Sequence, residues 1–156
     1  MPDEDLLVSY QATSGRFEPV WTLEIQTVVD DVDKILDAVV EVHPLRYGTY
    51  ERNASVSAVG METARPPLGS TTATHVADFV AGSVESYPVV EVKISIDRDL
   101  KTLGEVMDAI LEVHHYEEPV IYLREDWASR AAYNPDNTNR NRWWNNGRGL
   151  PERIEQ

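Results

Sequence analysis

Apolar and polar residues alternate in two stretches of the chain, which is the pattern of a β-strand that buries one face. The alternation is visible in residues 20–28. It is clearest in residues 90–96, where Glu91, Lys93 and Ser95 each lie between two valine or isoleucine residues. Both stretches are therefore predicted to be half-buried strands. Two further strands are predicted at residues 50–59 and 119–123.

Between these strands, apolar residues recur at three- and four-residue spacing, as on the buried face of an amphipathic helix. The first helix is predicted to begin after an N-cap at Asp30 or Asp31 and to end at the His-Pro pair 43–44. The second is predicted to begin with a capping box formed by Thr102 and Glu105. The buried positions are Val32, Ile35, Leu36, Val39 and Val42 in the first helix and Leu103, Val106, Met107, Ile110 and Leu111 in the second.

The two predicted helices repeat each other. Residues 35–43 match residues 106–114 in character at a constant offset of 71 positions. The order of elements is strand, helix, strand, a long excursion over residues 60–88, strand, helix, strand. This order predicts an α+β fold, the ferredoxin-like α/β plait, in which a duplicated split βαβ unit forms an antiparallel sheet with both helices on one face. We expect another subunit or the C-terminal tail to cover the other face.

The predicted plait occupies residues 18–123. Residues 1–17 are then an N-terminal arm, and residues 124–156 are a tail that packs on the domain or on a neighbouring subunit. Because large exposed aromatic patches are rare, we expect Trp143 and Trp144 in this tail to be buried against a partner surface.

Composition narrows the classes of function. The chain has 156 residues, a net charge of −13 and no cysteine, which excludes disulfides and thiol chemistry. Residues 124–156 hold six arginines against five acidic residues, so residues 1–123 carry a charge of −14. An acidic body disfavours nucleic acid and anionic membrane surfaces as partners and favours cations. With no apolar run long enough for a membrane span and no recognisable secretory signal, a cytoplasmic location is expected.

Titratable side chains are most concentrated between the second predicted helix and the last strand. This second joint, residues 114–119, has the sequence HHYEEP. Its histidines can act as caps, because a protonated imidazole interacts favourably with the free carbonyl groups at a helix C-terminus. Alternatively, His115, Glu117 and Glu118 are candidate ligands of a divalent metal ion such as Cu, Zn or Ni, since imidazole with carboxylate suits these metals.

Acid-base catalysis is a further interpretation of the second joint. His114, Tyr116 and Glu117 are candidates to exchange protons with a substrate in a cleft closed by a neighbouring subunit. The enzyme would then be a lyase, an isomerase or a hydrolase acting on a small molecule.

Arginines near the end of the first predicted helix suggest a small anionic ligand, because a guanidinium binds carboxylate or phosphate through two parallel hydrogen bonds. The first joint, residues 43–52, holds two of them. Surface pairing with the abundant carboxylates is the alternative. The candidate ligand-binding residues are Arg46, Tyr47, Tyr50, Arg52 and Arg65.

The HHYEEP motif at residues 114–119 resembles the His-Pro-Tyr-Glu-x-Pro motif of the CutA divalent-ion tolerance proteins. It is even more similar to the His-Pro-Tyr-Glu-Glu-Pro motif of the CutA-type domain inserted into the Nif-like (NGG-interacting factor) proteins, with a histidine in place of the first proline. The resemblance covers roughly residues 20–123. It implies the plait and a trimer like those of CutA and the nitrogen-regulatory PII proteins, with ligand clefts between subunits. Weaker matches upstream are Gly48, Tyr50, Gly60 and Pro66.

From these patterns we expect a homotrimer that binds a divalent metal ion or a small anionic molecule at its subunit interfaces. The small-molecule enzyme with His/Tyr/Glu acid-base chemistry is the alternative. A structural assembly module without a ligand is a third possibility.

Overall fold

A computed structural model of the chain describes residues 4–71 and 80–145. The chain divides into two compact units: a plait unit, Pro19–Asp126, and a terminal unit that joins Met1–Glu18 with Trp127–Gln156. Each unit is described by itself. None of the described helices combines the length and apolar composition needed to cross a bilayer.

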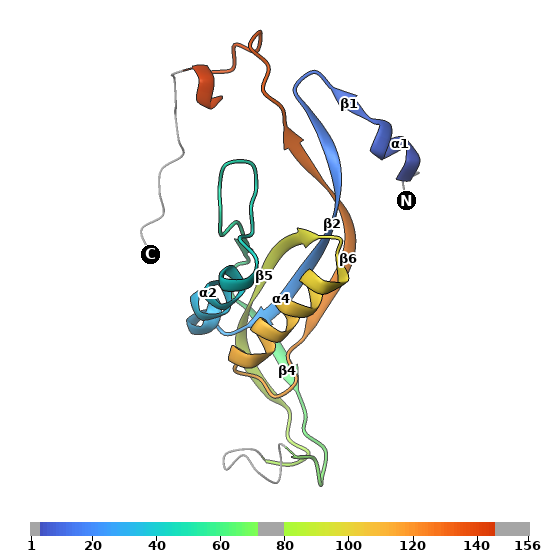
Figure 1. Cartoon of the computed structure of the whole chain (residues 1–156). Helices are drawn as coiled ribbons and strands as arrows, with labels where there is room; N and C mark the ends of the chain where they lie inside the picture. The colour runs from blue at the N-terminus through green and yellow to red at the C-terminus, as the bar shows by residue number, and fades with distance from the viewer. Residues whose placement is uncertain (1–3, 72–79, 146–156) are drawn as a thin grey trace. The chain divides into compact units, whose positions relative to one another are not determined.

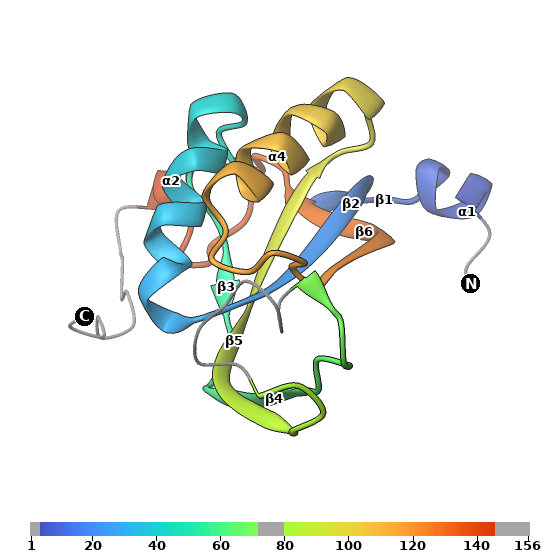
Figure 2. The same cartoon turned by 90° about the horizontal axis from the view of Figure 1, so that it is seen from below.

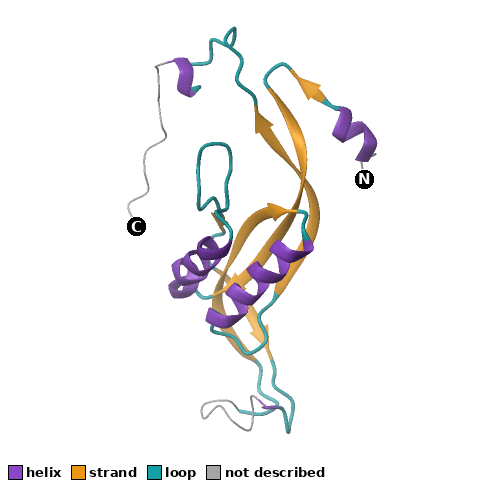
Figure 3. Ribbon diagram, viewed as in Figure 1, coloured by secondary structure: helices purple, strands orange, loops and turns teal. Residues whose placement is uncertain are grey.

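The elements follow the predicted alternation of strands and helices, with additional short elements near both ends (Figures 1 and 3). The helices are α1 (Glu4–Ser9), η1 (Val29–Asp31), α2 (Val32–Val42), α4 (Leu100–Val113) and η2 (Trp143–Asn145), of which η1 and η2 are 3₁₀ turns. The strands are β1 (Gln11–Ala12), β2 (Gly15–Thr27), β3 (Ser55–Val56), β4 (Gly60–Ala64), β5 (Glu85–Asp97) and β6 (Ile121–Ala131).

The sheet has β2 and β5 at its centre, paired antiparallel from Val20 opposite Asp97 to Thr27 opposite Val90. β6 pairs with the other side of β2, and β3 and β4 both pair with β5. The strand order β6-β2-β5-β3 is that of a ferredoxin-like plait. Both α2 and α4 lie on one face of this sheet (Figure 2). The predicted fold class is confirmed.

The core lies between that sheet face and the two helices. Strand residues such as Leu23, Ile25 and Ile94 alternate into it and meet Val39 of α2 and Ile110 of α4, all fully or almost fully buried. Burial of each such side chain stabilises the fold by about 1.5–3 kcal/mol relative to its exposure. This is why the two alternating stretches and the two amphipathic patterns are the most reliable signals in the sequence.

The opposite face of the plait sheet is polar. Glu24 of β2 lies opposite Lys93 of β5 and forms an ion pair with Arg124 of β6. Because successive strand residues point to opposite faces, these charged residues cannot contribute to the core.

The predicted second strand, residues 50–59, is wrong in extent, because β3 covers only Ser55–Val56. Pairing with β5 ends at Ser57, whose N–H donates to Glu91 O while its Oγ accepts the Glu91 N–H at 2.9 Å. The Ser57 hydroxyl thus accepts the Glu91 N–H, which a backbone carbonyl would have accepted if the strand had continued.

The predicted excursion over residues 60–88 is also wrong at both of its ends. Gly60–Ala64 forms β4, which pairs antiparallel with Glu85–Val89, the first part of β5. Its GMETA sequence has no apolar alternation, because its exposed positions leave no buried face to fill. Backbone pairing with β5, which the side-chain pattern does not report, defines this strand.

The last strand is longer than predicted, running from Ile121 to Ala131 rather than over residues 119–123. Residues that were expected to belong to the arm also form elements, since α1 and β1 precede β2 and β2 begins at Gly15. A Cβ at Gly15 would lie 2.6 Å from the carbonyl oxygen of Arg130. The close approach of two backbones therefore requires glycine at this position.

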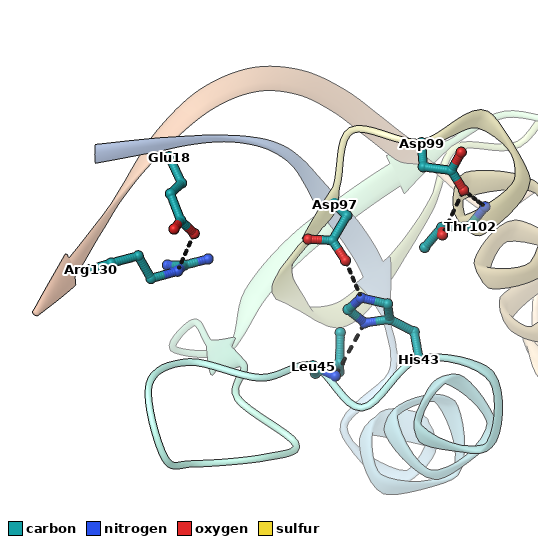
Figure 4. Close-up of polar contacts among 7 residues, drawn as sticks. All are labelled: Glu18, His43, Leu45, Asp97, Asp99, Thr102 and Arg130. Carbon is teal, nitrogen blue, oxygen red and sulfur yellow. Dashed lines mark hydrogen bonds and ion pairs between the residues drawn. The ribbon is translucent and has the colours of Figure 1, made fainter. Parts of the chain in front are cut away.

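The terminal unit is held by contacts between its two segments. Arg130 Nε lies 3.1 Å from a carboxylate oxygen of Glu18 (Figure 4), and the Ala132 N–H donates to Ser14 O at 3.0 Å. The ring of Trp144 lies edge-on to Tyr133, with centroids 5.1 Å apart. The expected burial of the tryptophan pair against a partner stays a prediction, and the side chain of Trp143 lies outside the described part of the structure.

Helix α4 begins three residues earlier than the predicted capping box. Asp99 is the N-cap, and its carboxylate accepts the Thr102 N–H at 2.7 Å and the Thr102 hydroxyl at 2.8 Å (Figure 4). Glu105 instead pairs with Lys101 at 2.9 Å, one turn away on the exposed face. The prediction failed because Thr102 is not the N-cap residue. It is instead the residue whose N–H the Asp99 side chain accepts.

Candidate functional site

His114 ends α4 and has both ring nitrogens engaged with backbone groups. Its Nδ1 accepts the N–H of Tyr116 at 3.0 Å, and its Nε2 lies 2.8 Å from the carbonyl oxygen of Gln26 on β2. Because a carbonyl can only accept, Nε2 carries the proton and Nδ1 presents its lone pair. His114 therefore joins the end of α4 to the central strand, and neither nitrogen remains for proton exchange with a substrate. Its predicted catalytic role has no support in this geometry.

The Tyr116 hydroxyl is buried and makes no hydrogen bond to the described residues within normal geometry. Burial, followed by the nearby negative charge of Glu62, raises the pKa of Tyr116 to about 12. Its ring centroid lies 5.3 Å from that of His114 and 6.2 Å from that of His115. Tyr116 is therefore a neutral phenol at physiological pH, with a hydroxyl group able to donate a hydrogen bond.

Asp31 is the N-cap of α2 but uses no side-chain hydrogen bond for capping. Its Oδ2 is buried without a hydrogen-bond partner in the described residues, and it lies 3.9 Å from His115 Nδ1. That distance is too long for a hydrogen bond. A buried carboxylate oxygen without a donor is costly, so this atom is a candidate ligand-binding group.

Glu62 reaches this region from β4. It lies directly opposite Tyr87 in the antiparallel register of β4 and β5, so the two side chains project from the same face of the pair. Both residues, together with Asp31, influence the pKa of Tyr116 electrostatically. Four separate segments thus contribute to one cluster. We call it the second-joint site, comprising Asp31, Glu62, Tyr87, His115 and Tyr116.

The predicted metal ligands are His115, Glu117 and Glu118, all exposed in the second joint. Within residues 4–71 and 80–145, no group of three or more histidine, aspartate or glutamate side chains is arranged to hold a metal ion. One chain thus offers the pair His115 and Asp31 rather than a complete coordination sphere. The three assignments stay predictions.

The first joint repeats the histidine arrangement of the second. His43 Nδ1 accepts the N–H of Leu45 at 3.1 Å, and His43 Nε2 lies 3.5 Å from a carboxylate oxygen of Asp97 (Figure 4). Leu45 has a left-handed backbone, with φ of 49°, and its side chain is 1% exposed in the core. The residue that follows the histidine by two positions is therefore part of the core in the first joint.

Two of the predicted anion-binding arginines are already paired with carboxylates. Arg46 donates to Glu51 through Nε at 3.0 Å and Nη2 at 2.9 Å. Arg52 bridges Asp33, at 2.7 Å, and Asp37, at 3.0 Å, on successive turns of α2. The bond to Asp33 is the main reason that the pKa of Arg52 is raised. These guanidinium groups serve the protein's own acids, the alternative considered from the sequence.

The other candidates of that set are dispersed. Arg65 is exposed and has no hydrogen bond or ion pair to the described residues. Tyr47 and Tyr50 are joined to each other by two backbone hydrogen bonds around the turn at Gly48, at 2.8 and 3.1 Å. The predicted anion site therefore stays untested.

Sequence reasoning missed three members of the second-joint site: Asp31, Glu62 and Tyr87. Asp31 was considered only as a helix cap, whereas its side chain caps nothing. Glu62 and Tyr87 lie at the two ends of the predicted excursion, and only their strand register brings them together. The GMETA sequence of β4 carries no side-chain alternation that could have indicated this strand.

Comparison with known proteins supports the fold. No protein-family model and no curated protein sequence matches the chain. Among solved structures, a Bacillus cereus protein related to NIF3 is similar over 74% of this chain and 28% of its own, with 17% identity and a TM-score of 0.55. This chain thus spans less than a third of the length of the NIF3-related protein.

Smaller proteins of the predicted kinds are also similar. The divalent ion tolerance protein CutA1 from Ehrlichia chaffeensis matches over 69% of this chain and 80% of its own, with 11% identity and a TM-score of 0.48. The nitrogen regulatory PII-like protein CPII from Thiomonas intermedia K12 matches over 72% and 96%, with 11% identity and a TM-score of 0.43. These structural neighbours are of the kinds that the HHYEEP motif resembles, and the similarity to the NIF3-related protein supports the α+β plait.

Proposed function

We propose that this protein is a CutA/PII-like module that forms a homotrimer and binds a small cation at the second-joint site. The observation that carries the proposal is the buried Asp31 Oδ2, which has no hydrogen bond to the described residues and lies in one cluster with Glu62 and the Tyr116 hydroxyl. A cation would compensate the cost of burying that carboxylate oxygen.

Charge favours a cation over the small anion considered from the sequence. The acidic groups of the site are the carboxylates of Asp31 and Glu62, and the adjoining Glu117 and Glu118 add further acidic side chains. The arginines Arg46 and Arg52 are engaged elsewhere. An anion would therefore meet repulsion at the second joint without a compensating guanidinium.

A divalent metal ion and a protonated amine share this chemistry. For a metal, His115 and Asp31 supply nitrogen and oxygen ligands suited to Zn, Cu or Ni, and carboxylates of a neighbouring subunit would complete the coordination. For an amine, Asp31 and Glu62 would accept hydrogen bonds. In either case Tyr116 stays protonated and does not coordinate a metal as phenolate.

The trimer is proposed on the uncovered polar face of the plait sheet. Within the described residues of the plait unit, both long helices cover the same face. The other face carries charged residues, such as Glu24 and Arg124, and the exposed ring of Tyr122, which is 57% exposed. A sheet face with an exposed aromatic ring beside ion pairs is consistent with a subunit interface.

The test is native mass spectrometry combined with titration calorimetry on chelator-treated protein. We expect a trimer that binds Zn²⁺, Cu²⁺ or Ni²⁺, or in a separate arm a protonated alkylamine. Binding should weaken at least about tenfold, or about 1.4 kcal/mol, in Asp31→Asn and in His115→Ala. Glu105→Gln removes an exposed acid of α4 that pairs with Lys101, and this control should bind like the wild type.

Two results would contradict the proposal: a monomer under native conditions, or cation binding that is unchanged by Asp31→Asn. If binding is lost equally in Glu105→Gln, general acidity rather than the second-joint site explains it. Enzymatic use of His114, Tyr116 and Glu117 has no observation of this kind in its favour and stays a prediction.

A further inference from the structure

The imidazole of His114 takes a place in the backbone hydrogen-bond ladder of the sheet. Gln26 of β2 donates its N–H to Val120 O at 3.0 Å, at the start of the last strand. The carbonyl oxygen of Gln26 accepts a hydrogen bond from a side chain, His114 Nε2, at 2.8 Å. One residue of the central strand is thus bonded to both ends of the segment 114–120. The second joint is closed against β2 by a side chain as well as by backbone.

The same ring determines where Tyr116 lies. Its Nδ1 accepts the Tyr116 N–H at 3.0 Å, so the ring links Gln26 O to Tyr116 N through two consecutive hydrogen bonds. Both bonds require the neutral tautomer with the proton on Nε2. The rings of His114 and Tyr116 also contact each other, with centroids 5.3 Å apart. Backbone and side chain of Tyr116 are therefore both positioned by His114.

We infer that His114 is the positioning residue of the second-joint site, which holds the Tyr116 hydroxyl beside Asp31 and Glu62 by connecting it to β2. This inference rests on the proposed function for the identity of the site, but not for the placement of Tyr116. His114 acts through Tyr116 and does not itself contact the ligand, since both of its nitrogens are occupied.

His43 provides the matched comparison. Its Nδ1 makes the same bond two residues ahead, to Leu45 N–H, but its Nε2 faces the largely exposed carboxylate of Asp97 at 3.5 Å instead of a strand carbonyl. The residue it holds is apolar and buried. Loss of the histidine in the first joint should therefore alter local order without affecting the second-joint site.

The experiment separates the two bonds of His114 by substitution. His114→Asn keeps a side-chain oxygen that can accept the Tyr116 N–H, as in an Asx turn, but is too short to reach Gln26 O. His114→Ala removes both bonds, and His43→Ala is the control. The readouts are the ¹⁵N signature of the histidine tautomer, hydrogen exchange of the Tyr116 amide, nuclear Overhauser contacts between the Tyr116 ring and Tyr87, and affinity for Zn²⁺ alone.

We expect the wild type to show the Nε2–H tautomer at His114 and a protected Tyr116 amide. In His114→Ala, the Tyr116–Tyr87 contacts should disappear and Zn²⁺ affinity should fall at least tenfold. His114→Asn should restore protection of the Tyr116 amide, but because it lacks the link to Gln26 O its Zn²⁺ affinity should stay at least about threefold below that of the wild type. His43→Ala should change neither the protection of the Tyr116 amide nor the Zn²⁺ affinity.

The inference is overturned if His114 carries its proton on Nδ1, or if the Tyr116 ring contacts persist in a folded His114→Ala variant. If that variant does not fold, failure of His114→Asn to protect the Tyr116 amide overturns it equally. Absence of Zn²⁺ binding in the wild type would refute a zinc site in the proposed function, whereas the tautomer, amide and ring-contact measurements would still decide the positioning role.

Discussion

The two joints that follow α2 and α4 begin alike and end differently. In each, a histidine at the helix C-terminus accepts the N–H of the residue two positions ahead, at 3.1 Å in the first joint and 3.0 Å in the second. The first joint then buries Leu45 and pairs its arginines with its own carboxylates. The second buries the hydroxyl of Tyr116 near carboxylates that lack a comparable arginine pair.

This difference shows that a repeated local arrangement does not carry a function by itself. The histidine turn is a solution to a backbone problem, because it satisfies an N–H just beyond a helix end. Function depends on whether the surrounding charges are compensated within the chain. In the first joint Arg46 and Arg52 are paired with carboxylates, whereas the buried Asp31 Oδ2 near the second joint has no hydrogen-bond partner among the described residues.

The comparison is tested most strongly at the residues that the two histidines hold. Leu45→Ala should reduce the free energy of unfolding by about 3 kcal/mol, because it empties a fully packed core position. Tyr116→Phe should change it by less than about 1 kcal/mol, since the lost hydroxyl makes no hydrogen bond to the described residues. Urea denaturation of both variants measures this. Equal losses would mean that the second joint is a core element like the first.

The histidines themselves should differ by a smaller amount. His114→Ala removes two hydrogen bonds to backbone groups and should reduce the free energy of unfolding by about 2 kcal/mol. His43→Ala removes one such bond and a contact to Asp97, whose side chain is 84% exposed, and should cost about 1 kcal/mol. Thermal and urea unfolding give the ranking. A larger loss at His43 would reverse our view of which joint is tied to the sheet.

Alkaline pH should distinguish the joints next. Because the pKa of Tyr116 is raised to about 12 in the folded state, against about 10 in an unfolded chain, its contribution to stability is complete below pH 10. It is lost as the pH rises from 10 to 12, since only the unfolded state then releases the proton. We expect the wild type to lose roughly 1 kcal/mol more than Tyr116→Phe over this range.

Urea titrations at pH 9, 10.5 and 12 measure this alkaline effect. Tyr50→Phe is the matched control, since Tyr50 is an exposed tyrosine of the first joint. It should retain the pH dependence of the wild type. An identical pH dependence in Tyr116→Phe would show that the phenol of Tyr116 is solvated.

The smallest effect is expected at Arg52. Its ion pairs with Asp33 and Asp37 are partly exposed, so Arg52→Gln should reduce the free energy of unfolding by only about 0.5 kcal/mol. The loss should shrink in 1 M NaCl because salt screens exposed charges. Zn²⁺ binding at the second joint should not change. A weaker Zn²⁺ affinity would show that the two joints are coupled.

Much of the fold could be predicted because its strongest signals arise from burial. The alternation in β5 and the three-four spacing in α2 and α4 are imposed by one shared core. By contrast, β4 over most of its length and residues 122–126 of β6 are exposed on both faces. A strand that buries little has no side-chain period to detect, and its position follows from the backbone partner alone.

The site was predictable only in part for a related reason. His115 and Tyr116 lie in one dense motif and were identified, whereas Asp31 and Glu62 reach them from distant parts of the chain. Their participation depends on the register of β4 against β5 and on a helix cap that is not used for capping. Neither property is local in sequence, so no spacing rule could report it.

The pairing of β2 with β6 has a consequence for how the chain is made. β2 begins at Gly15, but its partner on one side is the last long strand, Ile121–Ala131. Contacts that join opposite ends of a chain form slowly because a large loop must close first. During synthesis, one edge of the central strand therefore remains open until β6 has left the ribosome, and this edge is where a nascent or truncated chain would aggregate.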